Sequence, residues 1–162
     1  MRNNKVWHAI VLGLMLGLAP VLSLAGDKPT PEEAKKVIDF NYHGKGKGVV
    51  LAQTKVCHDI QREGDDKNEC TNEITGPVKK GEAVYIWLMF MAPDGQDSQS
   101  VSVQFEQNAT SRAVKKVQVP GQLRSRSWLK YTFDKAGAWK IKVATDSGAS
   151  PEALGELTIN VE

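Results

Sequence analysis

Apolar and polar positions alternate along most of the chain beyond residue 48, with the period of two that a strand with one buried face produces. Strand-like segments occupy residues 49–57, 83–91, 100–107, 112–119, 123–133, 138–144 and 154–161. The first segment is expected to place Val50, Ala52, Thr54 and Val56 on one face, whereas 83–91 is apolar on both faces, as in a central strand. About seven short strands separated by turn residues predict an all-β, immunoglobulin-like antiparallel β-sandwich over 49–162. A small closed barrel is the alternative.

The first 25 residues have the pattern of a secretory signal peptide. Arg2 and Lys5 give a positive start, an uncharged apolar run follows from 9 to 25, and small residues end it at Ala25. This order predicts export, with cleavage after Ala25 and a periplasmic or secreted protein. A retained membrane anchor is the alternative, but the run is marginal in length and Pro20 interrupts it.

A short helix is predicted between the signal peptide and the strands. Thr30 suits the N-cap, Pro31 the first helical position, and Glu33 completes a capping box. The helix should cover residues 31–40, and a Gly-rich connector then leads to residue 48. The pattern leaves open whether residues 26–48 pack on the sandwich.

The charge of the chain is balanced overall but unevenly distributed. The chain has 21 basic and 19 acidic residues, and export would remove two of the basic ones, which argues against a general nucleic-acid binder. Residues 59–73 carry six acids and two bases, and 112–130 carry six bases and no acid. Cys57 and Cys70 are the two cysteines, which in an oxidising compartment predicts a disulfide that closes the acidic loop.

The segment 123–133 divides into two faces. Residues expected to fill the core are Leu123, Leu129, Tyr131 and Phe133. The opposite, basic and aromatic face carries Arg124, Arg126, Trp128 and Lys130. Guanidinium groups beside an indole can bind an anion and stack a sugar ring, so this face is the candidate site for an anionic envelope glycan or lipid. The alternative is a solvated face on which arginine stems cover Trp128.

A second stripe follows the central segment. It consists of Tyr85, Trp87, Met89 and Met91, opposite Ile86, Leu88 and Phe90. One face must enter the core, and the other, if exposed, would suit a partner protein. The alternative is that the helix or a long loop covers it.

Catalytic and cofactor motifs are weak in this chain. Beyond the signal peptide only His43 and His58 are histidines, and no nucleophile elbow or zinc-protease motif occurs. Soft copper ligands are present as Cys57, His58, Cys70, Met89 and Met91, but their spacing matches no known site. We therefore expect no enzyme, no cofactor and no metal.

Three stretches carry a resemblance to a known family. They are Val84-Tyr85-Ile86-Trp87, Leu123-Arg124-Ser125-Arg126-Ser127 and Gly137-Ala138-Trp139-Lys140-Ile141-Lys142-Val143. Together they resemble a bacterial family of secreted or membrane-attached β-sandwich domains of unknown function, over about residues 50–161. The resemblance implies an extracytoplasmic, non-enzymatic module and supplies no catalytic residues.

These patterns favour an exported binding or accessory module of the cell envelope. Its expected partner is an envelope glycan or anionic lipid on the basic and aromatic face. The alternative is a protein–protein or structural role in an envelope assembly, through the apolar 85–91 strand or an exposed sheet edge.

Overall fold

The computed structural model describes residues 29–42, 48–146 and 151–162, and for 39–42 only the backbone. The predicted signal peptide and most of the Gly-rich connector lie outside the described residues. The elements are α1 (Pro31–Tyr42), β1 (Val50–Ile60), β2 (Cys70–Glu73), β3 (Ala83–Met91), β4 (Gln99–Gln107), β5 (Thr110–Val119), β6 (Ser125–Thr132), β7 (Gly137–Thr145) and β8 (Ala153–Val161). No helix in these ranges is long and apolar enough to cross a membrane.

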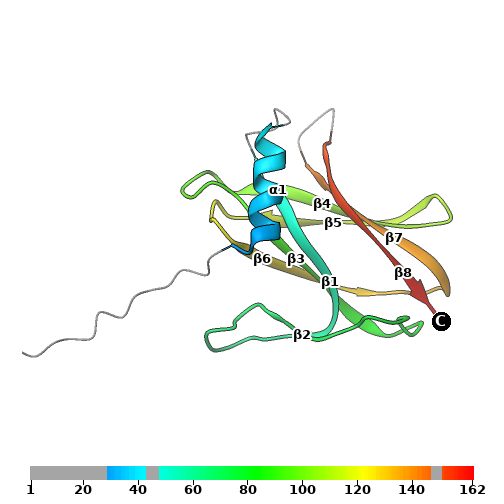
Figure 1. Ribbon diagram of the computed structural model, residues 1–162. Coiled ribbons are helices and arrows are strands. Elements are labelled where there is room, and N and C mark those ends of the chain that lie inside the picture. Colours follow the sequence, from blue (N-terminus) through cyan, green and yellow to red (C-terminus); the bar gives the residue numbers. More distant parts are fainter. Residues whose placement is uncertain (1–28, 43–47, 147–150) are drawn as a thin grey trace, which may run out of the picture.

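The strands form two four-stranded antiparallel sheets, in the orders β2-β1-β3-β6 and β5-β4-β7-β8 (Figure 1). The predicted immunoglobulin-like β-sandwich is therefore confirmed, and each of the seven expected strands corresponds to an observed one. The eighth, β2, was not predicted because its sequence, Cys-Thr-Asn-Glu, is polar and only four residues long. The helix is two residues longer than expected, since it ends at Tyr42.

The inner faces of the two sheets form the main core. Three of its large buried side chains, Phe105, Phe133 and Trp139, form an aromatic cluster with the partly buried Tyr131. Leu129 also enters this core, but the prediction for Leu123 is wrong: that side chain is 54% exposed. The strand starts only at Ser125, so Leu123 lies in the preceding turn, where the alternation of a strand does not apply.

A bulge in β1 corrects a second prediction. The pairing of β1 with β3 shifts between Leu51 and Gln53, so Ala52 is the extra residue. Leu51 and Val56 face the main core, whereas Ala52 faces the opposite side of the sheet. The expected common face for Val50, Ala52, Thr54 and Val56 is therefore wrong.

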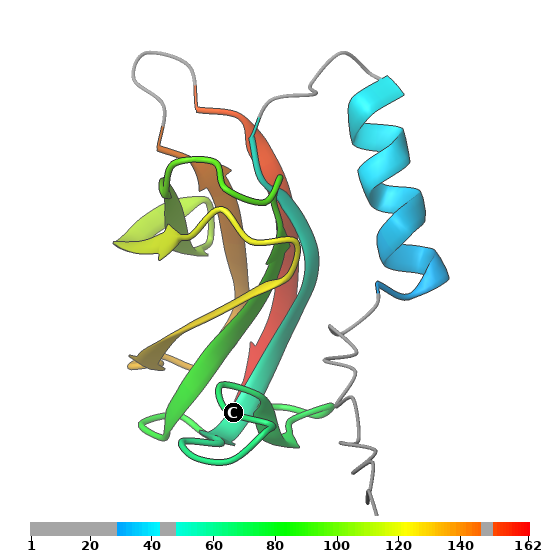
Figure 2. The same cartoon turned by 90° about the vertical axis from the view of Figure 1, so that its left-hand side faces the viewer.

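A second apolar cluster lies on the outer face of the β2-β1-β3-β6 sheet. Its buried members are Ala52, Cys57, Ile60, Trp87, Met89 and Met91, with Val37, Cys70, Tyr85 and Trp128 packed against them. Figure 2 shows α1 standing beside β1 on this outer face. The described part of the 26–48 segment thus packs on the sandwich, as one alternative predicted, and the idea of an exposed apolar stripe for a partner protein is wrong for Trp87, Met89 and Met91.

The predicted disulfide between Cys57 and Cys70 is present and closes the acidic loop. Replacing both cysteines by alanine should lower the free energy of unfolding by about 3 kcal/mol, because the open chain gains loop entropy in the unfolded state. Urea unfolding of the oxidised protein and of the double variant measures the difference. Identical midpoints would show that the loop is held by its other contacts alone.

Tyr131 stacks on Phe105 at 3.7 Å between ring centroids, at the margin of the main core. Burial raises the pKa of its hydroxyl above the ordinary 10.0; the charge of Asp134 adds to this, and Arg112 opposes it. Because the folded-state pKa lies above the unfolded-state value, Tyr131 contributes stability that is lost as pH rises through that pKa. We expect Tyr131→Phe to flatten the alkaline decline of the thermal midpoint above about pH 10, and a decline unchanged in the variant would contradict this.

Candidate functional site

The predicted ligand face lies where β6 pairs with β3 on the outer side of the sheet. The register places Met89 opposite Arg126, Trp87 opposite Trp128, and Tyr85 opposite Lys130. The two sequence-predicted stripes are therefore neighbours and form one surface. This surface is covered at one end by α1 and at the other by the disulfide-closed loop (residues 61–69).

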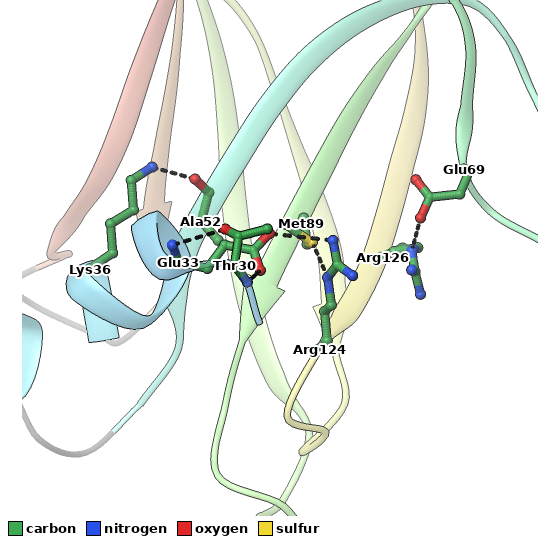
Figure 3. Close-up of polar contacts among 8 residues, drawn as sticks. All are labelled: Thr30, Glu33, Lys36, Ala52, Glu69, Met89, Arg124 and Arg126. Atoms are coloured by element: carbon green, nitrogen blue, oxygen red, sulfur yellow. Dashed lines mark hydrogen bonds and ion pairs between the residues drawn. The ribbon is translucent and has the colours of Figure 1, made fainter. Parts of the chain in front are cut away.

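Arg124 fastens the helix to the sheet. Its guanidinium donates to Glu33 Oε1 at 3.3 Å and to the sulfur of Met89 (Figure 3). Glu33 is almost fully buried and also accepts a hydrogen bond from the Thr30 N–H at 2.9 Å, which completes the predicted capping box. Nearby, the Lys36 ammonium donates to the carbonyl of Ala52 in the β1 bulge. Arg124 thus serves a structural contact in this fold.

Arg126 fastens the acidic loop in the same way, because its Nε donates to Glu69 (Figure 3). The loop is also held by Asn68, whose backbone carbonyl accepts the indole N–H of Trp87 at 2.6 Å and whose side-chain Oδ1 accepts that of Trp128 at 3.4 Å. Two of the four predicted ligand-binding side chains are therefore engaged by carboxylates of the chain itself.

The remaining part of the face is a compact group of two rings and two cations. Trp128 meets Tyr85 edge to face at 5.7 Å, and the Arg62 guanidinium lies 4.1 Å from the Trp128 centroid. Arg62 also lies 5.3 Å from the centroid of Tyr85, and the Lys130 ammonium lies 5.7 Å from it. We call Arg62, Tyr85, Trp128 and Lys130 the cationic aromatic cluster.

Neither cation of this cluster is paired with an acid. Within the described ranges, neither Arg62 nor Lys130 forms an ion pair with a carboxylate, and both residues are exposed. Sequence reasoning missed Arg62 because it belongs to the acidic loop, which the Cys57–Cys70 disulfide and the contacts of Asn68 and Glu69 hold over the sheet. An arginine inside an acidic segment gives no local signal of this placement.

A groove of about 460 Å³ lies at the open edge of the sandwich, between β1 and β8. Its lining residues are Thr54, Lys55, Val56, Glu73, Ile74, Thr75, Gly76, Pro77, Leu157, Thr158, Ile159 and Asn160. The sequence analysis considered an exposed sheet edge as a binding surface, but it did not indicate that the edges of β1 and β8 lie on either side of a groove.

The candidate copper ligands are not brought together. Cys57 and Cys70 are joined in the disulfide, Met89 and Met91 are buried in the outer cluster, and His58 instead pairs with Glu82 at 3.0 Å. Among the described residues, no group of three His, Cys, Asp or Glu side chains could hold a metal ion. The sequence-based expectation that the protein binds no metal stays a prediction.

Comparison with known proteins adds no assignment of function. No family model and no curated protein matches the chain. The C-terminal domain of wzt is similar with a TM-score of 0.49 and 5% identity, over 72% of this chain and 74% of that one. A CARDB domain from Pyrococcus furiosus, in complex with di-metal ions, is similar with a TM-score of 0.40 and 12% identity, over 71% of this chain and 88% of that one. A β-glucosidase from Listeria innocua, in complex with glucose, is similar with a TM-score of 0.40 and 11% identity, over 67% of this chain and 16% of that one. These identities and TM-scores are too low to assign the chain to a family.

Proposed function

We propose that this chain is an exported, non-enzymatic binding module of the cell envelope. Its ligand is an anionic envelope component, a glycan or a lipid headgroup, and its binding site is the cationic aromatic cluster. The observation that supports this most is that Arg62 and Lys130 both lie over the ring of Tyr85, while no described carboxylate forms an ion pair with either.

The Arg62 and Lys130 cations lie near the same ring, and an anion bound beside that ring is attracted by both. A guanidinium stacked on an indole keeps its N–H edges available for a phosphate or carboxylate, because stacking uses only its face. Tyr85 and Trp128 are only partly buried, and their remaining exposed surface adds apolar contact area for a sugar ring. Arg124 and Arg126 act as positioning residues, since they hold α1 and the loop that carries Arg62.

The test compares two double variants of equal charge. Arg62→Ala with Lys130→Ala removes the cations of the cluster, whereas Lys79→Ala with Lys80→Ala removes two exposed cations from the turn before β3, outside the cluster. The probes are cell-wall fragments, lipopolysaccharide fragments and anionic lipid micelles, measured by calorimetry. We expect the first variant to lose about tenfold or more in affinity for one of these probes, because hydrogen bonds to charged groups contribute about 1.5–3 kcal/mol each.

Binding should also weaken as salt is raised, because the cations are solvent-exposed. The turn variant should bind like the wild type. Equal affinities in the wild type and the cluster variant, for every probe that binds, would contradict the proposal.

A further inference from the structure

The edges of β1 and β8 face each other across the opening between the two sheets. Both strands start at the same end, where they touch: a Cβ on Gly155 would lie 2.9 Å from Leu51 Cδ2. They separate toward their far ends, and residues 74–78 cross the gap there. Figure 1 shows this divergence of β1 and β8, and the groove occupies the wedge between them.

Backbone groups of both strands point into this wedge. The Val56 carbonyl accepts the Ile74 N–H at 2.8 Å, on the edge of β1 that faces away from β3. Because backbone groups alternate in direction along a strand, those of Thr54 point to the same edge. Thr54 has no backbone partner there among the described residues, since β2 pairs with β1 only farther along the strand.

The edge of β8 is open in the same manner. The Asn160 carbonyl accepts the Val78 N–H at 2.9 Å, and the Glu162 N–H donates to the Val78 carbonyl at 2.9 Å, both on the side away from β7. By the same alternation, the N–H and C=O groups of Glu156 and Thr158 project from this edge. In the described part of the chain these groups have no backbone partner.

The side chains of the groove specify a neutral occupant. Ile74, Leu157 and Ile159 are partly buried against the main core and provide an apolar floor. At the rim, the charges of Lys55 and Glu73 are already paired with each other at 2.9 Å. The groove therefore offers alternating backbone donors and acceptors with an apolar floor and no unpaired charge.

We propose that this groove binds an extended, uncharged segment of a partner polypeptide, which pairs with β8 as an added strand. A peptide backbone repeats its donors and acceptors at the spacing of a strand, roughly 3.3 Å per residue, which a sugar or a lipid chain does not. Every second side chain of the segment lies on the apolar floor. This interaction is separate from the cationic aromatic cluster, and either one can exist without the other.

The test uses the acetylated and amidated peptide Thr-Val-Thr-Val-Thr as the probe. An amide NMR titration should show saturable shifts at Glu156 and Thr158, together with slower hydrogen exchange of both N–H groups. Thr158→Pro removes a backbone N–H donor that points away from β7, and an edge strand tolerates proline at such a position. This variant should abolish the peptide-induced shifts. Thr158→Val keeps the N–H and should bind like the wild type.

A second variant distinguishes loss of peptide binding from a folding defect of Thr158→Pro. A Cβ on Gly76 would meet open space, so Gly76→Leu should fold and fill the groove, and it should reduce the affinity for the peptide at least tenfold. Absence of shifts with millimolar peptide, or equal binding by the wild type, Thr158→Pro and Gly76→Leu, would overturn the proposal. Chemical-shift changes of the groove residues that increase with protein concentration in the absence of peptide would also overturn it. They would show that a second copy of the chain occupies the groove.

Discussion

Replacing Glu33 by alanine should release α1 from the sandwich. The variant removes a carboxylate that is 1% exposed and that binds both the N-terminal turn of the helix and the Arg124 guanidinium. Removing one partner of a buried ion pair costs about 3–5 kcal/mol if the helix stays packed, because the other charge is then desolvated, and release of the helix avoids this cost. We therefore expect loss of hydrogen-exchange protection in α1 and increased binding of a hydrophobic dye, as Trp87 and Met89 become accessible.

The matched control is Glu32→Ala, in the same helical turn. Glu32 is exposed, so its removal changes the charge of the helix N-terminus equally but breaks no buried contact. Its effect should stay within about 0.3–1 kcal/mol, the range of a charge at a helix N-terminus. If the amide hydrogens of α1 exchange with solvent at the same rate in both variants, the ion pair between Glu33 and Arg124 does not hold α1 on the sheet.

Trp139→Ala should be the most damaging single change in the main core. Its indole is 1% exposed, lies 5.1 Å from Phe133 between ring centroids, and donates its N–H to the Lys135 carbonyl at 2.9 Å. Truncating a buried tryptophan costs about 3–5 kcal/mol through lost transfer energy and the cavity that remains. Since domains are stable by only about 5–15 kcal/mol, much of the variant should be unfolded at moderate temperature.

Trp139→Phe separates packing from hydrogen bonding. It keeps an aromatic ring next to Phe133 but removes the donor to Lys135, which should cost about 1 kcal/mol for the bond itself, and the smaller ring adds a part of the packing cost. Calorimetric unfolding of the three proteins gives both differences. A loss below about 1 kcal/mol for Trp139→Ala would mean that the ring contributes no more than an ordinary surface residue.

Local patterns in the sequence were sufficient for much of the fold. The alternation of period two located the seven longer strands, and the capping residues Thr30 and Glu33 located the helix start, because both signals depend on near neighbours in sequence. The disulfide followed from there being two cysteines in the chain. The bulge at Ala52 could not be predicted, since it has no sequence signature beyond a break in alternation that only the core reveals.

The candidate site was only partly predictable for a related reason. Trp128 and Lys130 were placed correctly on the outer face, but Arg124 meets Glu33 across 91 positions and Arg126 meets Glu69 across 57. Contacts at such separations depend on how α1 and the loop fold back on the sheet, and a basic stripe looks the same whether acids cover it or not. Arg62 could be added to the site only once that folding was known.

The most direct test of the proposed function is an NMR titration of residues 26–162, oxidised, with inorganic phosphate at low salt. The signals to follow are the Arg62 Nε–H and the Trp128 indole N–H, with the Trp139 indole as a buried reference. We expect saturable shifts of both signals in the wild type, loss of the Trp128 shift in the Arg62→Ala, Lys130→Ala variant, and no change at Trp139 in either protein. A Trp128 shift of equal size in the variant, or no shift of either signal in the wild type, would contradict an anion site at the cationic aromatic cluster.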